Sequence, residues 1–514
     1  MADLIVGMRG LIRIWIALAA LTSGLISFAA CTGNGDRPEN RIKILASDTL
    51  EDIIHKAARV TPTPRQMAWQ RLEFQAFVHF GINTFTNLEW GDGTEDPGLF
   101  DPREFDADQW IRVFAAAGMR GVILTAKHHD GFCLWPSRHT EHSVKNSPWK
   151  GGKGDVVREV AEACRRGGLK FGIYLSPWDR HEPSYGDSPR YNRHFKKQLH
   201  ELLTGYGPVS EVWFDGACGE GPNGKRQVYD WGGYYALVRR LQPAAVISIR
   251  GPDVRWCGNE AGHTRPSEWS VIPLAVDPSR HDWTDMTAED LGSRAKLEDA
   301  SYLVWYPAQV NTSIRPGWFY HPEEDDKIKT LGHLRDIYFT SVGGNAQFLL
   351  NLPPDRRGLI HENDAARLRE FGRRLRNDFT RNLAEGAAVT ASAVHLKGQF
   401  LPLRNMLDGD TSTYWMPDAE TKTVDLTFEL ARDVIFNCAA LQEAIEVGQR
   451  IEDFSLEIWD GGEWREAAQA SVVGYRRLLR FDSATTRRVR LRIRASRLSP
   501  ALAEFGLYRI SSLP

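Results

Sequence analysis

Short apolar segments alternate with amphipathic segments from about residue 70 to residue 352, which is the pattern of repeated strand–helix units around a parallel sheet. The predicted strands are Phe74–Phe80, Gly121–Ala126, Leu169–Leu175, Glu211–Phe214, Ala244–Ile249, a segment near Trp269–Ile272, Tyr302–Trp305 and Phe348–Leu352. Between them, segments such as Ala107–Ala117 carry apolar residues at three- and four-residue intervals, as helices do. Eight strands over this length favour a (β/α)8 TIM-like barrel over a doubly wound sheet, and no GxGxxG motif follows the first strand.

Polar residues follow these strands at their carboxyl ends. They are His79, His128-His129-Asp130, Tyr174 with Trp178, Asp215 and Arg250, in the order of the first five strands. In a barrel, catalytic residues gather where strands run out into loops at the C-terminal face. We therefore expect these side chains to share one barrel mouth.

The pattern changes after Arg381, where short, partly alternating segments are bounded by Gly, Asp or Ser. That description fits an antiparallel β-sandwich such as a jelly roll. A chain of 514 residues is also long enough for two domains. We predict a catalytic barrel over residues 61–380 and a β-sandwich over residues 381–514, with the boundary near residues 376–386.

The N-terminus is typical of an export signal. Arg9 and Arg13 precede the apolar run Ile14–Ala30, which is followed by Cys31 and then by polar residues. Residues 1–31 resemble a bacterial lipoprotein signal in which Cys31 receives the lipid, whereas Phe28 departs from that pattern and leaves plain secretion open. Residues 32–60 are predicted to form a tether and lead-in. The expected location is the periplasm or the outer cell surface, with membrane attachment only through Cys31.

The overall charge argues for a neutral substrate. The chain carries 64 basic and 66 acidic residues, a formal net charge of -2, so no long-range field favours nucleic acid or an anionic membrane. The 17 Trp, 14 Tyr and 23 Phe offer flat faces that suit sugar rings, although most aromatic residues fill cores. Six scattered cysteines without CxxC pairs indicate neither a disulfide framework nor structural zinc.

Asp215 is the strongest candidate for a catalytic group. It ends the apolar strand Val212-Trp213-Phe214 and precedes Gly216, so its carboxylate is placed to attack the anomeric carbon of a sugar. An isolated Asp in this setting is more often a turn or cap residue. Retaining hydrolysis needs a second carboxyl group about 5 Å away that begins protonated. Glu220, Glu260 and Glu268 are the candidates, and Trp256 near Glu260 would supply desolvation.

His128-His129-Asp130 raises a competing hypothesis, a metal-dependent barrel hydrolase. Adjacent residues on an extended segment point to opposite sides, and no second HxH motif follows. Hydrogen bonding to sugar hydroxyls is the alternative interpretation, because a neutral imidazole both donates and accepts.

Several motifs together resemble the α-L-fucosidases, a family of retaining glycoside hydrolases with a (β/α)8-like barrel. They are Phe77-Val78-His79-Phe80-Gly81, Glu89-Trp90-Gly91, Thr125-Ala126-Lys127-His128-His129-Asp130-Gly131-Phe132, Gly172-Ile173-Tyr174, Trp213-Phe214-Asp215-Gly216 and Ser313-Ile314-Arg315-Pro316-Gly317-Trp318. The resemblance spans roughly residues 60–355, and the combined motifs are far more specific than any one of them.

The resemblance implies a role for each matching residue. Asp215 becomes the nucleophile that forms a covalent fucosyl-enzyme, and Arg250 lies beside it. Trp213 and Trp318 become apolar walls, Trp318 near the C5 methyl group. The implied contacts to fucose are His79, Glu89, Trp90, His128, His129 and Tyr174.

The segment Trp256-Cys257-Gly258-Asn259-Glu260 resembles the subgroup that prefers fucose linked α-1,3 or α-1,4 on branched oligosaccharides. In that subgroup the Glu of this motif is the acid/base, which points to Glu260, with Glu268 as the competitor. The expected activity is exo-hydrolysis of fucosylated oligosaccharides or glycoconjugates, with no cofactor needed for catalysis. A glycan-binding protein without catalysis is a third hypothesis, although both candidate carboxylates are present.

The C-terminal region is similar to discoidin-like, galactose-binding-type domains. In those domains a calcium ion often lies where a loop like Asp408-Gly409-Asp410 meets a late Glu, here Glu504. Asp408, Asp410, Thr413 and Glu504 offer the hard oxygen ligands that calcium prefers. A turn with self-bonding Asp side chains is the alternative interpretation of this loop.

Overall fold

A computed structural model describes residues 39–280, 286–393, 401–418 and 421–511, which belong to one compact unit. The predicted export signal, Cys31 and the start of the tether lie outside the described residues. Within the described ranges, no helix combines the length and the apolar character that crossing a membrane requires. The five described cysteines, Cys133, Cys164, Cys218, Cys257 and Cys438, carry free thiols.

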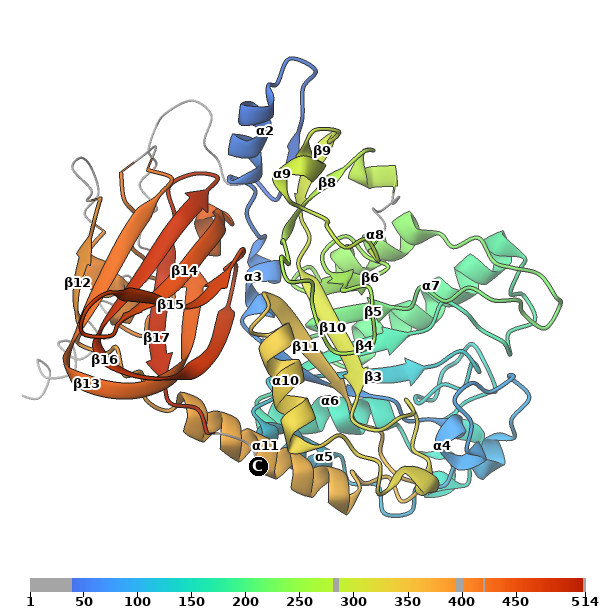
Figure 1. The fold of residues 1–514 in the computed structure, drawn as a ribbon. Coiled ribbons are helices and arrows are strands. Elements are labelled where there is room, and N and C mark those ends of the chain that lie inside the picture. The colour runs from blue at the N-terminus through green and yellow to red at the C-terminus, as the bar shows by residue number, and fades with distance from the viewer. Residues whose placement is uncertain (1–38, 281–285, 394–400, 419–420, 512–514) are drawn as a thin grey trace, which may run out of the picture. The chain divides into compact units, whose positions relative to one another are not determined.

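Eight parallel strands form the sheet of the first domain, in the spatial order β6-β5-β4-β3-β2-β11-β10-β7 (Figure 1). Their bounds are β2 Phe74–Val78, β3 Gly121–Lys127, β4 Lys170–Leu175, β5 Glu211–Phe214, β6 Val246–Ile249, β7 Arg255–Trp256, β10 Ala308–Ser313 and β11 Ala346–Asn351. A parallel bridge between Ser248 and Val254 joins the two ends of this order, so the barrel is nearly closed. The predicted (β/α)8-like barrel is confirmed.

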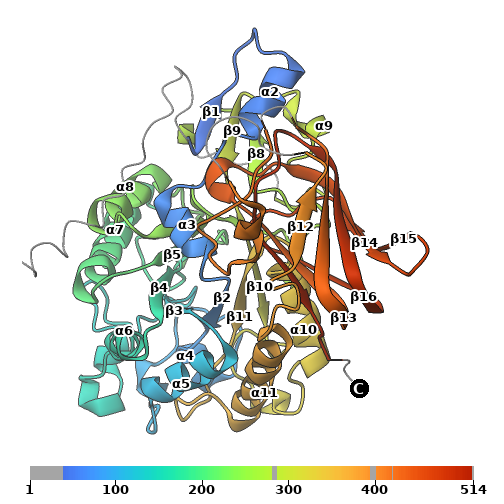
Figure 2. The same ribbon diagram turned by 90° about the vertical axis from the view of Figure 1, so that its left-hand side faces the viewer.

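Helices cover the outside of this sheet, as both ribbon views show (Figures 1 and 2). They include α5 Ala107–Ala117, α6 Val156–Gly167, α7 Ser188–Gly205, α8 Trp231–Leu241, α10 Leu331–Ser341 and α11 Glu362–Phe379, with the shorter α3 Pro64–Gln70. The short α4 Ile82–Thr86 follows β2, and Leu297 of the short α9 Arg294–Leu297 packs on Ile53 and Ile54. Four of the helices begin at an aspartate whose carboxylate accepts a backbone N–H of the first turn, namely Asp106, Asp155, Asp187 and Asp230. Such caps satisfy donors that the helix itself leaves free.

Two predicted barrel strands belong to a different sheet. The segments near residues 269–272 and at Tyr302–Trp305 form β8 Val271–Leu274 and β9, which pair antiparallel with each other, and β9 also pairs with β1 Arg41–Lys43. Apolar residues of this side sheet pack on α2 Leu50–Ala57. The barrel uses β7 and β10 instead. β7 has only two residues and β10 is rich in polar residues, so neither produces an apolar strand pattern.

The second domain is built of antiparallel strands, as predicted for a discoidin-like sandwich. Its strands are β12 Ala388–Ala391, β13 Val424–Glu443, β14 Ile451–Trp459, β15 Trp464–Ala470, β16 Arg477–Ser496 and β17 Leu502–Tyr508. Register shifts interrupt the pairing of β13 with β16, and such bulges bend long strands. The core is apolar and includes Phe428 stacked on Phe505 at 4.0 Å.

Candidate active site

The carboxyl ends of the parallel strands bring the predicted polar residues to one place. His79 follows β2, His128 and His129 follow β3, Tyr174 lies in β4, and Asp215 follows β5. The rings of His79 and His128 lie 5.6 Å apart, and Nε2 of His129 lies 4.0 Å from Oδ2 of Asp215. Residues that are more than 130 positions apart in sequence therefore line a single mouth.

Both carboxylate oxygens of Asp215 have a donor. Oδ2 accepts the hydroxyl of Tyr174 at 2.9 Å, and Oδ1 accepts the backbone N–H of Ala217 at 2.8 Å. The Asp215 side chain keeps 25% of its surface exposed, so the fixed carboxylate still faces the mouth. Burial and the nearby Asp215 charge hold the pKa of Tyr174 well above its usual value, so this hydroxyl remains a donor.

The hydrogen-bond partners of two histidines fix their tautomers. Nδ1 of His129 lies 2.7 Å from Oγ of Ser176, whose hydroxyl donates to the carbonyl of Trp178, so Nδ1 must donate. Nδ1 of His79 donates to Oδ1 of Asn351 at 2.8 Å, because the amide nitrogen of Asn351 is used on Ser313 and Trp318. Each ring therefore keeps Nε2 as a hydrogen-bond acceptor.

All three histidines of the mouth favour the neutral form. Burial lowers the pKa of His79 to about 4 and that of His128 well below its usual value, and it also lowers the pKa of His129. The expectation that His128 and His129 point to opposite sides is wrong. Both residues follow the end of β3 at a turn, and their ring centroids lie 4.1 Å apart.

A metal centre does not emerge from this histidine cluster. Among the described residues, no three His, Cys, Asp or Glu side chains converge so as to hold a metal ion. Nδ1 of His128 is buried and meets no hydrogen-bond partner within the described part of the chain.

Aromatic side chains form the apolar walls. Trp213 stacks on Tyr174 with ring centroids 5.2 Å apart, and Trp318 lies 5.2 Å from His79. Phe77 lies beneath both tryptophans. Trp90 is 57% exposed and meets His129 edge-on at 5.6 Å. The mouth thus combines an apolar wall with a polar wall, an arrangement suited to a sugar ring with one apolar face.

The two rival glutamates differ sharply in environment. Glu260 lies on the exposed loop after β7, and its carboxyl group bonds to Trp318. Partial burial and the charge of Asp215 raise the pKa of Glu260 above its usual value. Glu268 is only 1% exposed and is bound by the guanidinium groups of Arg255 and Arg265. The third sequence candidate, Glu220, is exposed, and its backbone pairs with that of Arg226 in an isolated antiparallel β-bridge.

A family model described as alpha-L-fucosidase matches residues 64–378, which is more than half of the chain. The chain belongs to the alpha-L-fucosidase family. An F5/8 type C domain model matches residues 388–505 of the same fucosidase. The enzyme is accordingly a glycoside hydrolase.

Relatives of this fucosidase cover most of its length. Alpha-L-fucosidase 1 of Arabidopsis thaliana is 41% identical over 459 residues, 87% of each chain. A solved structure from Bacteroides ovatus superposes with a TM-score of 0.83 at 47% identity, covering 93% of this chain and 79% of that one. A GH29 fucosidase from Ruminococcus gnavus, solved in complex with fucose, has a TM-score of 0.78 at 31% identity and covers 94% and 98%.

Glu89 has partners in the fucosidase that its sequence did not reveal. Its carboxylate accepts the backbone N–H groups of Trp318 and Phe319 at 2.9 and 3.0 Å and lies 2.7 Å from Nε2 of His321. Glu89 thus holds the loop that carries Trp318. Asn351, which orients His79, was missed as well. It is the polar residue that ends β11, so the strand-end rule could have found it.

Arg250 of the fucosidase follows β6 through an unusual backbone conformation. Ile249 has φ of 70°, a value that β-branched residues rarely adopt. Arg250 donates its N–H to the carbonyl of Phe214, next to Asp215, and its own carbonyl accepts the hydroxyl of Tyr235. The strained turn therefore places Arg250 beside the strand end that carries Asp215.

The predicted calcium ligands of the second domain also lie together. Oγ1 of Thr413 donates to Oδ2 of Asp408 at 2.8 Å. Burial, followed by the charges of Asp408 and Asp410, raises the pKa of Glu504 to about 7. Oε1 of Glu504 is buried and meets no hydrogen-bond partner among the residues that the structure describes. Neutral donors, namely backbone N–H groups and the hydroxyls of Ser412 and Thr413, bond to these carboxyl groups.

Proposed function

We propose that this enzyme is a retaining exo-α-L-fucosidase in which Asp215 is the nucleophile and Glu260 is the acid/base. The observation that carries the proposal is the fixed carboxylate of Asp215, held by Tyr174 and Ala217 in the mouth toward which Glu260 is turned. Raised pKa values favour a protonated carboxyl group at rest, which is what a general acid requires.

The proposed reaction has two steps. In the first, an Asp215 oxygen bonds to the anomeric carbon, the glycosidic C–O bond breaks, and Glu260 gives its proton to the leaving oxygen. In the second, the Glu260 carboxylate takes a proton from water, the water oxygen bonds to the same carbon, and Asp215 leaves as a carboxylate. Burial and the charge of Asp215 both raise the pKa of Glu260, and esterification of Asp215 removes the second of these effects. The pKa of Glu260 therefore falls in the intermediate, which favours the ionised carboxylate that acts as base.

The polar wall is proposed to bind the sugar hydroxyls. Nε2 of His79 and Nε2 of His129 are acceptors because their Nδ1 atoms donate to Asn351 and Ser176. Each sugar hydroxyl can donate to one of these nitrogens. His128, Glu89, Trp90 and Arg250 are proposed to complete the fucose contacts, and Trp318 and Trp213 to face the apolar side of the ring.

The proposed substrates carry fucose linked α-1,3 or α-1,4 on branched oligosaccharides or glycoconjugates. Support comes from the resemblance of Trp256-Cys257-Gly258-Asn259-Glu260 to the subgroup with that preference. Comparing fucose release from a Lewis-type trisaccharide with release from an α-1,2-linked trisaccharide tests the linkage. Equal rates of release from the two trisaccharides would contradict the proposed linkage preference.

Asp215→Gly is the variant that tests the nucleophile. We expect loss of turnover with unchanged thermal stability, and rescue by azide, a small anion that needs no deprotonation and occupies the vacated space. Proton NMR of the first product should show the α anomer of fucose, because two inversions retain the configuration. A first-formed β anomer, or full activity of Asp215→Gly, would overturn the proposal.

Two other functions are separated by simple measurements. A metal-dependent hydrolase would lose activity on dialysis against EDTA, whereas the proposed mechanism predicts unchanged activity. A glycan-binding protein without catalysis would bind the Lewis-type trisaccharide and release no fucose.

We also propose a structural calcium ion in the second domain, held by Asp408, Asp410, Thr413 and Glu504. The fit rests on the unpartnered, buried Oε1 of Glu504 and on the hard oxygen donors around it. Backbone carbonyls must complete the ligand set, since side chains alone form no metal-holding group among the described residues. No catalytic step depends on this ion.

Export to the periplasm or the cell surface remains part of the proposal, and it rests on residues 1–31, including the lipid acceptor Cys31. Mass spectrometry of the mature N-terminus distinguishes lipidated Cys31 from a plain cleaved signal.

A further inference from the structure

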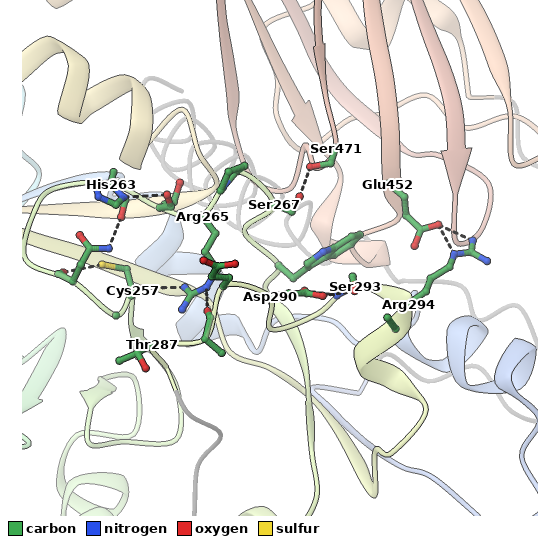
Figure 3. Close-up of a pocket in the computed structure, with 18 of the residues that line it drawn as sticks. Cys257, His263, Arg265, Ser267, Thr287, Asp290, Ser293, Arg294, Glu452 and Ser471 are labelled. Carbon is green, nitrogen blue, oxygen red and sulfur yellow. Dashed lines mark hydrogen bonds and ion pairs between the residues drawn. The ribbon is translucent and has the colours of Figure 1, made fainter.

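The loop that carries Glu260 faces a cavity on one side. It leaves β7 at Trp256 and runs along residues 257–267, where several residues line a cavity of about 1220 Å³. Figure 3 shows this cavity opening between the loop and the second domain, with polar side chains around it. The end of the loop is bound to α10, where the backbone N–H of Thr264 donates to the carbonyl of Thr340 at 3.0 Å. Its start is held from the cavity side.

Gly258 shows how tightly one point of the loop is held. Its φ is 99°, and a Cβ atom there would lie 2.3 Å from the carbonyl oxygen of Met286. Such a separation is too short for a side chain, so only glycine fits. The loop therefore runs directly against the backbone of the segment at residues 286–288.

Arg265 ties these two segments together. Its guanidinium group donates to the carbonyl of Cys257 at 2.9 Å, to that of Ala288 at 2.7 Å and to that of Met286. Cys257 is three residues before Glu260. A planar guanidinium presents several donors in one rigid group, so one side chain fixes three backbone positions.

Glu268 in turn holds Arg265. Its Oε2 lies 3.3 Å from Nη1 of Arg265 and accepts the backbone N–H of the same residue at 3.1 Å. The second cation on Glu268 is Arg255, which is fully buried in β7, the strand that leads into the loop. The cluster thus connects the start of the loop, its end and the neighbouring segment.

Stability alone does not explain this cluster well. Burying an ion pair costs desolvation that its attraction barely offsets, so buried pairs are poor stabilisers. Of the three carbonyls bound by Arg265, that of Cys257 lies at the start of the Glu260 loop, and those of Met286 and Ala288 lie in the segment against which the loop runs. The arrangement is suited to fixing the position of one loop.

We propose that Arg265, held by Glu268, is a positioning residue that keeps Glu260 within reach of the leaving-group oxygen. The inference rests on the proposed role of Glu260 as acid/base. Its consequence is specific to proton donation, because the nucleophile and the sugar contacts come from other strands.

Leaving-group dependence separates this role from a general structural one. Release of 4-nitrophenolate needs little protonation, whereas release of a sugar alcohol needs a proton donor. For Arg265→Met we expect kcat/KM on a fucosyl disaccharide to fall about 10-fold or more, while kcat/KM on 4-nitrophenyl fucoside stays within about threefold. Arg265→Lys keeps the charge beside Glu268 but cannot span three carbonyls, so we expect the same direction with a smaller loss.

The control is Arg294→Met. Arg294 lines the same cavity and is paired with Glu452, so it tests the loss of an arginine there. We expect both substrates to be hydrolysed as by the wild type. If Arg265→Met does not fold, Arg265→Lys decides the question.

Glu260→Gln supplies the reference. If Glu260→Gln loses disaccharide hydrolysis selectively but the Arg265 variants slow both substrates equally or neither, the positioning role is wrong and the role of Glu260 stands. If Glu260→Gln itself shows no such selectivity, the proposed acid/base fails, and the inference about Arg265 fails with it.

Discussion

The hydroxyl of Tyr174 donates to Oδ2 of Asp215 at 2.9 Å, from a ring that is completely buried and stacked on Trp213. The ring cannot follow the carboxylate if Asp215 moves, so the bond fixes the orientation of the Asp215 carboxylate. In the proposed mechanism, Tyr174 would also stabilise this carboxylate as it is released in the second step, because a hydrogen bond to a charged acceptor is stronger than one to an ester.

Tyr174→Phe should therefore slow the reaction without unfolding the enzyme. A hydrogen bond to a charged group contributes about 1.5–3 kcal/mol, which corresponds to a fall in kcat of about 10- to 100-fold. Steady-state and single-turnover kinetics on 4-nitrophenyl fucoside measure this fall in kcat. Tyr206→Phe is the control, since Tyr206 donates to Asp155 on an outer helix. Equal losses in both variants would contradict the role of Tyr174.

The raised pKa of Glu260 predicts the basic limb of the pH profile. Glu260 must be protonated to act as an acid, so activity on a disaccharide should fall as pH rises through its pKa, which lies above the usual glutamate range. Glu260→Gln cannot titrate, and the residual kcat/KM of this variant on the same disaccharide should lose that limb. The exposed Glu220→Gln should keep the wild-type profile. A basic limb that persists in Glu260→Gln would assign it to another group.

The barrel was predictable because its first five strands and the last one are mostly apolar, as parallel strands covered by helices usually are. The strand β10 does not have this apolar pattern. Its inward-facing Gln309 bonds to Glu211, Trp213 and Gln347, so a polar hydrogen-bonded layer fills that part of the barrel. Val271–Leu274 and Tyr302–Trp305 look like barrel strands because they are equally apolar, but their partners are β1 and α2. Local sequence does not reveal which surface an apolar strand will cover.

The candidate site was also predictable only in part. The strand-end rule gathers His79, His128 and Asp215, since that placement follows from the order of strands and loops alone. The environments of Glu260 and Glu268 could not be distinguished in this way, because the two lie eight residues apart in one loop region. Their difference depends on Arg255 and Arg265, which meet Glu268 only after the loop has folded.

Glu89→Ala should loosen the loop that carries Trp318. Two backbone N–H groups, of Trp318 and Phe319, would lose a charged acceptor, which predicts a destabilisation of about 1–3 kcal/mol. A displaced Trp318 wall should raise KM for 4-nitrophenyl fucoside more than it lowers kcat. Thermal melting and steady-state kinetics measure the two effects. Glu323→Ala removes an exposed carboxylate that pairs with Asn87, and we expect no change in KM. Unchanged KM in Glu89→Ala would refute the supporting role.

Calcium should stabilise the second domain in a pH-dependent way. The pKa of Glu504 is about 7, so in calcium-free protein this carboxyl group is protonated below that pH. As pH rises through 7 it becomes charged and is repelled by Asp408 and Asp410, so its contribution to the stability of the fold is lost. Calcium binds the ionised form and should therefore raise the melting temperature more at pH 8 than at pH 5.5, because binding to the folded state stabilises it. Glu504→Gln should abolish the shift in melting temperature caused by calcium, while the control Asp433→Asn on the same domain should keep it. EDTA should leave fucose release unchanged. An equal calcium shift in Glu504→Gln and the wild type would place the ion elsewhere.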